Sequence, residues 1–246
     1  MLAGMFLSKF DREGLAHLGF SSLWEAFNAI GYALGGKPTS VKNYMQEFDP
    51  LFPNKRQGWH KRKSRPHCRE AFERYGMLSL AEFSGLLSPL LLPSEISLPD
   101  GMDELALLDE DKLENDSFSR RLITGAAAEG FFEVSYPKLA EFSDHALANV
   151  TRCGCGFDFR LQPPAPRPFL AVEVKGMAGA IGEVMMTHKE HRVAEYLKDR
   201  YYLCVVRNFA ERPALTLFQN PLAQGLEFTC RERQQTTLTW HARITA

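Results

Sequence analysis

Three side chains in the C-terminal half have the types and the spacing of a chemically active cluster. Asp158 lies in a segment that alternates apolar and polar residues, and Glu173 and Lys175 lie in a second one, Phe169–Gly176. Such alternation is typical of β-strands, in which residues two apart project from the same face. A proline-rich turn separates the two segments. We therefore expect a hairpin that places Asp158 opposite Glu173 and Lys175.

Two carboxylates and a lysine on one strand pair suit chemistry at a phosphate. Mg²⁺ prefers carboxylate oxygens, main-chain carbonyls and phosphate as ligands. Bound Mg²⁺ makes water nucleophilic and stabilises the charge that develops on the phosphate oxygens, and a neighbouring lysine can orient the attacking water. The alternative interpretation is structural. Asp158 would then be a surface residue near a turn, and Glu173 and Lys175 would form an ion pair on a solvated face.

Two further glutamates are candidates for the same cluster. Glu129 lies within the apolar stretch of a helix expected over residues 117–134, and a carboxylate is uncommon among apolar residues. Glu190 lies on a later helix whose neighbouring side chains are mostly charged, so a solvated face is its alternative role. His188 and His191 on that helix could bind a metal ion. A third ligand is not evident, so a surface or phosphate-contacting role is favoured for both.

The expected elements follow one another in α-β-β-β-α-β order. They are the helix over 117–134, a strand within Ala146–Arg152, the two hairpin strands, a helix from about Thr187 and the apolar strand Tyr201–Arg207. Within this order, Asp158 followed by Glu173-Val174-Lys175 resembles the D…(D/E)xK signature of the PD-(D/E)XK, or restriction-endonuclease-like, nucleases. The resemblance implies a core with a mixed central sheet flanked by helices.

A narrower resemblance covers about residues 120–220. Residues 156–208 look like the nuclease-like domains related to the C-terminal domain of the NO VEIN protein. The likeness rests on Gly156-x-Asp158, Val172-Glu173-Val174-Lys175-Gly176, Thr187-x-x-Glu190-x-x-x-Ala194 and Tyr202-x-x-x-Val206. Phe157 occupies the position of the proline that can precede the aspartate. In this family that proline is often absent, so the departure is tolerable.

The resemblance implies metal-dependent hydrolysis of phosphodiester bonds. Asp158 and Glu173 would be the Mg²⁺ ligands, and Lys175 would position or activate the water. Glu129 would join through a metal-bound water. Glu190 would not bind the metal ion itself but would support the residues that do, or have a role specific to the family. It lies on a helix that Thr187 caps.

The pattern of the N-terminal region predicts two helices joined by a short turn, a helix-turn-helix candidate. Ser22 can cap a helix that ends near Gly35-Gly36, and Thr39 or Ser40 can cap a second one that stops before Asp49-Pro50. In this motif the start of the second helix enters the major groove. The residues that would read DNA are Thr39, Ser40, Lys42, Asn43 and Gln46, and the alternative is the polar side of a surface helix. Two more helices are expected, around 66–75 and 80–87.

The net charge of −1 conceals two strongly charged segments. Residues 37–74 contain ten Lys and Arg against four Asp and Glu, whereas residues 95–116 contain nine acids against one lysine. A basic segment with mobile cations and polar side chains suits contact with DNA phosphates, although charge runs are more often simply solvated. The DNA-contacting candidates in its densest part are Lys55, Arg56, His60, Lys61, Arg62, Lys63 and Arg65.

These patterns predict a small all-α, helix-turn-helix-like DNA-binding domain over residues 1–92, an acidic linker over 93–116 and an α/β (α+β) nuclease domain over 117–246. Five scattered cysteines do not form a disulfide framework, and no signal peptide or membrane span is recognisable, so a cytoplasmic protein is expected. Neither a phosphate-binding GxxxxGK[S/T] loop nor a nucleophile elbow occurs.

The combined expectation is a Mg²⁺-dependent DNA endonuclease of restriction type, similar to type II enzymes. A single active site cuts one strand, so a homodimer is expected for double-strand cleavage, and a separately encoded DNA methyltransferase is a candidate partner. Two alternatives stay open. One is a non-catalytic or regulatory DNA-binding protein with a nuclease-like fold. The other is a modification-dependent endonuclease.

Overall fold

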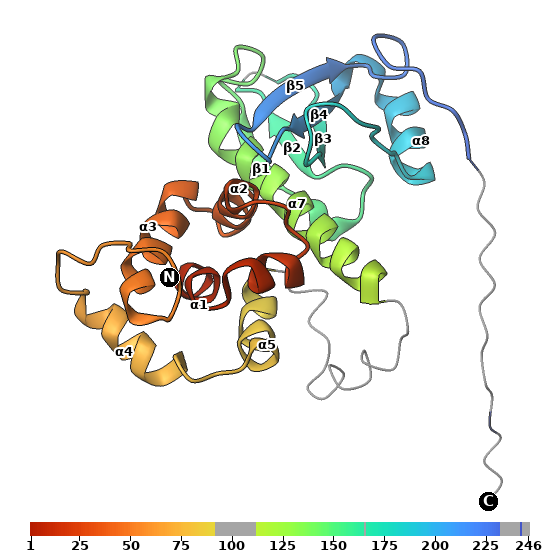
Figure 1. Ribbon diagram of the computed structural model, residues 1–246. Helices are drawn as coiled ribbons and strands as arrows, with labels where there is room; N and C mark the ends of the chain where they lie inside the picture. The colour runs from red at the N-terminus through yellow and green to blue at the C-terminus, as the bar shows by residue number, and fades with distance from the viewer. Residues whose placement is uncertain (92–111, 165, 232–241, 243–246) are drawn as a thin grey trace, which may run out of the picture.

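The computed structural model describes residues 1–91, 112–164, 166–231 and 242, without the side chains of residues 112–119. A helical N-terminal region is followed by a mixed five-stranded sheet with flanking helices (Figure 1). This α+β arrangement confirms the expected fold class. Most of the predicted acidic linker lies outside the described residues. Its last part, from Lys112, already belongs to a helix, and the three domain boundaries stay a prediction.

The helical region contains α1 to α5. Their bounds are α1 Leu2–His17, α2 Leu23–Ala33, α3 Pro38–Phe48, α4 Pro66–Tyr75 and α5 Leu80–Leu91, with a 3₁₀ turn, η1, at Asp49–Leu51. The expected cap of α2 is confirmed, because the Ser22 hydroxyl accepts from the Glu25 N–H at 3.2 Å. The expected cap of α3 by Thr39 or Ser40 is wrong. Lys37 is the N-cap and Pro38 opens the helix, where the missing proline N–H costs nothing.

Two of these helices depart from the sequence pattern. Helix α1 was not expected, and it buries Met5, Phe6 and Leu7 completely in the core. Helix α5 continues past the expected end at residue 87 to Leu91, although Pro89 lies inside it. The burial of Leu91, with 3% of its surface exposed, accounts for the extra turn.

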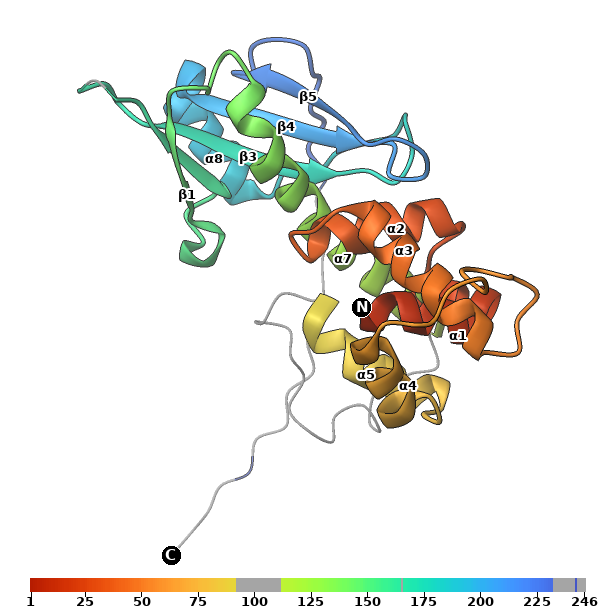
Figure 2. The same ribbon diagram turned by 90° about the vertical axis from the view of Figure 1, so that its left-hand side faces the viewer.

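Helix α7, Lys112–Ser135, joins the helical region to the sheet, because it packs against both α2 and β3 (Figure 2). Gly130 allows the close approach to α2, since a Cβ there would lie 2.3 Å from the Tyr32 carbonyl oxygen. Arg120 on α7 pairs with the buried Glu25 on α2 at 2.5 Å. The Asn28 amide donates to the Phe209 carbonyl at 2.8 Å. Apolar packing and polar contacts thus make one continuous core of the two regions.

The five strands lie in the order β1-β2-β3-β4-β5. Their bounds are β1 Ala146–Asn149, β2 Phe159–Gln162, β3 Leu170–Gly176, β4 Tyr201–Arg207 and β5 Ala214–Gln219. Among the described strands, β3 and β4 pair in parallel, and the other neighbours are antiparallel. The hairpin of β2 and β3 is therefore confirmed. Strand β5, which covers one edge, was not expected. Three 3₁₀ turns complete this part: η3 Tyr136–Lys138, η4 Thr151–Cys153 and η5 Lys198–Arg200.

Alternation along the strands assigns the two faces of the sheet to different helices. Val172 and Val174 belong to the same buried cluster as Ala128 of α7. Ala171 instead packs with Ala194 of α8, His188–Leu197. Glu173 and Lys175 share the register of Ala171, so they face α8. Within the described residues, no helix is long and apolar enough to cross a membrane.

Candidate active site

Asp158 lies immediately before β2 and is held against β3. Its N–H donates to the Val172 carbonyl at 3.0 Å, and its Oδ2 accepts from the Val174 N–H at 2.8 Å. Val174 lies between Glu173 and Lys175 in β3. The structure therefore brings the Asp158 carboxylate to the segment of β3 that carries the other two candidate residues.

Glu173 and Lys175 form a direct ion pair on the face of β3 that looks toward α8. The Lys175 Nζ lies 2.6 Å from Oε1 of Glu173 and 2.8 Å from Oε2 of Glu190. Glu173 is almost completely buried, with 4% of its surface exposed. This pair is therefore not on a solvated face, which argues against the simple structural alternative.

The start of α8 fixes Glu190 through a reciprocal cap. The Thr187 hydroxyl accepts from the Glu190 N–H at 3.3 Å, and Oε2 of Glu190 accepts from the Thr187 N–H at 3.0 Å. This capping box confirms Thr187 as the cap of the helix. The same Glu190 oxygen binds Lys175, so the helix start also sets the position of the lysine ammonium.

The cluster contains more carboxyl groups than cationic groups. Burial, together with the nearby Asp158, raises the pKa of Glu173 to about 8. Burial also raises the pKa of Asp158, partly offset by the hydrogen bond from Val174. Burial opposes the charged form of Lys175, yet Glu173 and Glu190 raise its pKa above the ordinary value. One ammonium thus faces three carboxyl groups, and a divalent cation would offset the excess.

Glu129 approaches the cluster from α7, on the other side of the sheet. Burial, with the nearby charges of Asp158 and Glu133, raises its pKa to about 7. A hydrogen bond with the Thr151 side chain and the charge of Lys175 act in the opposite direction. Glu129 is therefore electrostatically coupled to the cluster, although it does not share the face of β3 that carries Glu173.

Two residues of the site were missed in the sequence. The Tyr201 hydroxyl donates to the Gly156 carbonyl at 3.2 Å, and Tyr201 is fully buried. Gly156 has a φ of 91°, and a Cβ there would lie 2.9 Å from Cγ2 of Val193 on α8. Thr151 contacts the main-chain oxygen of Asp158 at 3.4 Å. In the sequence, the Gly156-x-Asp158 spacing was the one sign that the turn before Asp158 is closely packed.

The donor set fits Mg²⁺ with two protein ligands. Carboxylate oxygens are the hard ligands that Mg²⁺ prefers, and Mg²⁺ commonly keeps several waters beside one or two carboxylates. In the part of the chain that the structure describes, no three His, Cys, Asp or Glu side chains gather as a metal site. His188 is exposed, and His191 lies 3.9 Å from Glu195. Asp158 and Glu173 therefore remain the candidate ligands.

The helix expected to read DNA is only partly free at the surface. Thr39, Ser40 and Asn43 are exposed, whereas Lys42 and Gln46 are half-buried. The Lys42 ammonium lies 4.7 Å from the ring centre of Trp24, and the Gln46 carbonyl accepts from the Trp59 N–H at 2.8 Å. The first three side chains are thus available to a partner. The Lys42 side chain also packs on Trp24, whereas the contact at Gln46 is made by its main chain.

The basic loop, residues 52–65, divides into anchors and exposed cations. Arg56 lies between Asp11 and the buried Asp49, with its Nε 2.9 Å from Asp49. Arg65 binds the buried Glu47 at 2.5 Å. These two arginines hold the loop to the helices. The exposed residues of the predicted set are Lys55, His60, Lys61, Arg62 and Lys63.

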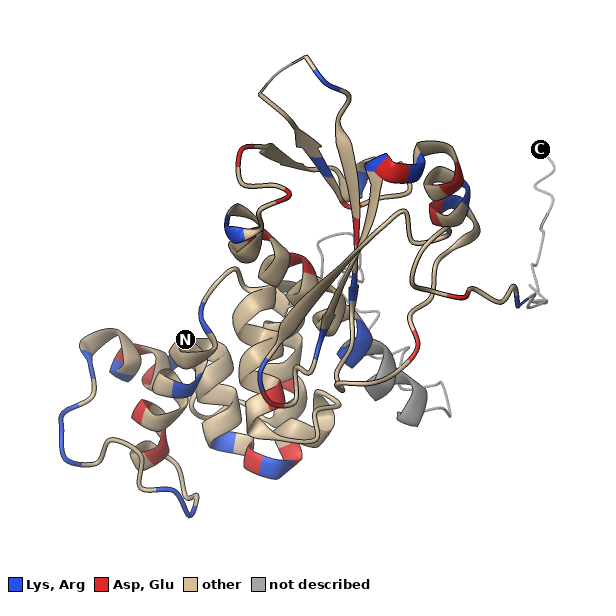
Figure 3. Ribbon diagram, turned by 90° about the horizontal axis from the view of Figure 1, so that it is seen from above, with Lys and Arg blue, Asp and Glu red and all other residues tan. Residues whose placement is uncertain are grey.

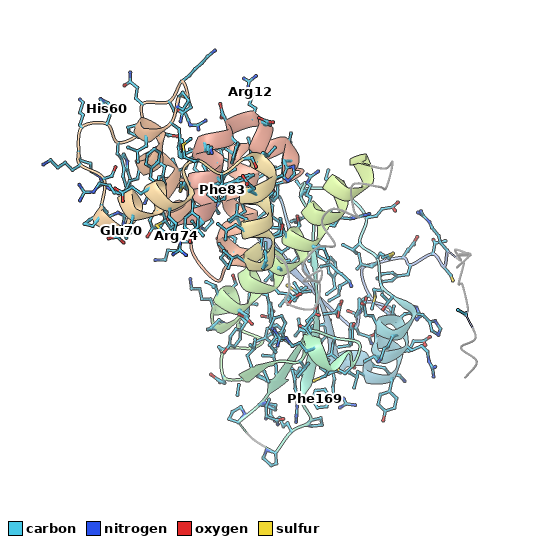
Figure 4. All side chains as sticks on the ribbon, turned by 90° about the horizontal axis from the view of Figure 1, so that it is seen from below. Arg12, His60, Glu70, Arg74, Phe83 and Phe169 are labelled. Carbon is cyan, nitrogen blue, oxygen red and sulfur yellow. The ribbon has the colours of Figure 1, made fainter. Side chains whose placement is uncertain are left out.

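The exposed cations lie at the outer edge of the helical region. Figure 3 shows Lys and Arg along this loop, and Figure 4 places His60 on the side of the molecule away from Phe169, which precedes β3. The Arg62 guanidinium lies 3.7 Å from the ring centre of Trp59. The loop therefore presents a stacked aromatic together with exposed cations, well separated from the β3 cluster.

Comparison with known families finds a similarity in the C-terminal part. Residues 135–218 match the family model described as Protein NO VEIN, C-terminal, a nuclease-like domain. The match confirms the narrower resemblance over this segment, which includes Asp158, Glu173, Lys175 and Glu190 but not Glu129. No curated protein and no solved structure shows a significant match to the chain.

Proposed function

We propose that the protein is a Mg²⁺-dependent DNA endonuclease of restriction type, with a PD-(D/E)XK active site. One observation carries the proposal. The Asp158 carboxylate touches the β3 backbone between Glu173 and Lys175, inside the segment that matches a nuclease-like domain. Buried carboxylates beside a charged lysine are costly unless they serve a function, which favours an active site over a structural ion pair.

Asp158 and Glu173 would hold the metal ion. When bound, Mg²⁺ would supply a nucleophilic water and would stabilise charge on the phosphate oxygens. Ionised ligands are required for binding, and the raised pKa values of both carboxyl groups favour tighter binding above neutral pH. Glu129 would contribute through a bound water, since its carboxyl group is coupled to that of Asp158.

Lys175 would orient the attacking water and neutralise charge on the phosphate. Its ammonium has three protons, of which two are donated to Glu173 and Glu190. If Glu173 turns toward the metal, Glu190 still holds the ammonium in place. Water oxygen would then bond to phosphorus as the bond to the 3′ oxygen breaks, which leaves a 5′-phosphate and a 3′-hydroxyl, with one water proton transferred to the leaving oxygen.

The helical region would bind the double-stranded DNA. Thr39, Ser40 and Asn43 would face the bases, and Lys61 and Lys63 would contact phosphates, since all five side chains are exposed. One cluster can cut one strand at a time, so cleavage of both strands would require two copies of the chain. A separately encoded methyltransferase would protect the host DNA.

Incubation with supercoiled plasmid tests this function. The wild type should nick or linearise the plasmid with Mg²⁺ and leave it intact with a chelator. Asp158→Ala and Lys175→Ala should lose this activity. The exposed Asp144 and Lys138 supply matched controls, because alanine at either position should leave cleavage unchanged. If the two active-site variants cut as well as the wild type, the assignment is wrong.

A second candidate function is a non-catalytic DNA-binding protein with a nuclease-like fold. It is favoured by the absence, among the described residues, of three metal-ligating side chains around one point. Such a protein would bind DNA in a salt-sensitive manner and would cut no DNA at any Mg²⁺ concentration. Neutralising Lys61 and Lys63 should weaken DNA binding under either function.

A further inference from the structure

The loop between β3 and α8, residues 177–187, exposes large apolar side chains at the rim of the candidate active site. Ile181 has 95% of its surface exposed and Met185 has 77%. Glu183 is the single charged residue of this loop. Apolar side chains of this size are costly to hold in water, so two of them exposed on one short loop suit a binding surface.

Both ends of this loop are fixed, and only its tip projects. The Met177 N–H donates to the Val206 carbonyl at 2.8 Å, and the Gly179 carbonyl accepts from the Asn208 N–H at 2.8 Å. At the other end, Met186 packs with the buried cluster beneath α8, and Thr187 caps that helix. The exposed side chains therefore lie on a loop whose two ends are anchored. Anchoring lowers the conformational entropy that is lost on binding.

The ends of the loop also carry the side chains of the active site. The loop begins directly after Lys175-Gly176 and ends at the helix that bears Glu190. Lys175 and Glu190 are hydrogen-bonded to each other at 2.8 Å. Met186 packs with Ala171 and Ala194, on the same side of β3 as Glu173, so we expect a phosphodiester bound at this cluster to lie near the loop. The near absence of charge on the loop makes it unsuitable for phosphate contact and suitable for contact with sugars and bases.

We propose that Ile181 and Met185 form an apolar wedge that contacts the base step next to the phosphodiester to be cut. Apolar side chains inserted between base steps unstack them and bend the duplex. This inference rests on the proposed DNA-cleaving function and deepens it. It assigns to the active-site rim a part in substrate binding that is separate from the basic loop, residues 52–65.

DNA binding in the absence of Mg²⁺ tests the wedge. The full chain and its Ile181→Ala/Met185→Ala variant are titrated, in a chelator, with random-sequence duplexes that carry 2-aminopurine, whose fluorescence rises on unstacking. The variant should bind roughly tenfold more weakly and should give no fluorescence rise, since buried apolar surface is lost. The slope of log affinity against log salt should not change, because no phosphate contact is removed. Met77→Ala, at a position with 94% exposure outside the loop, should match the wild type.

The outcomes separate this inference from the proposed function. Binding is measured without Mg²⁺. A protein that binds DNA but never cuts it would therefore refute the proposed nuclease activity, while the contribution of Ile181 and Met185 to DNA binding would still be measured. Unchanged affinity and fluorescence in the double variant would overturn the wedge. A variant that changes the sedimenting mass of the DNA-free protein would also overturn it, since the apolar pair would then bind a second copy of the chain.

Discussion

Replacing Glu173 by glutamine should make the metal-free protein more stable at pH 8. The pKa of Glu173 is about 8 in the folded protein, against an ordinary value of 4.5, because the side chain is buried beside Asp158. The folded state therefore binds this proton more tightly than the unfolded state does. Stability falls as pH rises from about 5 and the loss is complete near pH 8. Glutamine does not ionise, so the variant escapes this loss.

The size of the effect follows from the shift in pKa. Each unit corresponds to about 1.4 kcal/mol, so the shift of Glu173 corresponds to a loss on the order of 5 kcal/mol between pH 5 and pH 8. The lost ion pair with Lys175 reduces the net gain, although glutamine keeps an oxygen that can accept from that lysine. We therefore expect the variant to exceed the wild type by roughly 2–4 kcal/mol at pH 8 and to match it at pH 5.

Chemical denaturation at pH 5 and pH 8, in a chelator and in Mg²⁺, measures this effect. Mg²⁺ should stabilise the wild type strongly at pH 8 and little at pH 5, because protons and metal compete for the same carboxylates. It should not stabilise Glu173→Gln at either pH. Glu195→Gln is the control, since that side chain is 62% exposed. Parallel pH dependence of wild type and Glu173→Gln would refute the reasoning.

Three further predictions concern neighbouring parts of the molecule. Glu190→Gln should lower the cleavage rate by about 10- to 100-fold and leave DNA affinity unchanged in filter binding, because Glu190 positions Lys175, the proposed catalytic lysine. Arg56→Ala should lower the free energy of unfolding by about 3 kcal/mol in urea denaturation, since it leaves a buried carboxylate unpaired, whereas Lys61→Ala should weaken only DNA binding. Gly130→Ala should lower the melting temperature, because its Cβ would meet an α2 carbonyl, whereas Gly125→Ala, with open space around it, should raise it slightly.

Local sequence patterns predicted the part of the fold that carries the candidate active site. Alternation over two short segments gave the β2–β3 hairpin, and the Thr187-x-x-Glu190 spacing gave the capped start of α8. These features depend on residues a few positions apart, so a local pattern contains the necessary information. The approach of Asp158 to β3 followed from the hairpin alone.

Contacts between distant residues could not be predicted in this way. Arg56 and Arg65 looked like DNA-contacting cations, but Asp49 and Glu47 bind them, and nothing in the local sequence marks those acids as buried. Glycine inside a helix is usually destabilising, whereas the close approach of Tyr32 requires Gly130. Each of these roles depends on a tertiary neighbour that the linear pattern does not contain.

Strand β5 and helix α1 were missed for a different reason. Residues 214–219 alternate weakly and lie at a sheet edge, where half-burial leaves little hydrophobic pattern. Helix α1 has no side chain that caps its start, so no local pattern marks where it begins. Both elements are defined by what they pack against.

Calorimetric titration of the protein with Mg²⁺ at pH 8, followed by plasmid cleavage with the same samples, tests the central claim most directly. The wild type and the control Asp144→Asn should bind Mg²⁺ and cut DNA. Asp158→Asn, which keeps the size of the side chain and removes its charge, should do neither, because Asp158 is a proposed ligand held against β3. An Asp158→Asn protein that binds Mg²⁺ and cuts DNA as well as the wild type would contradict the account.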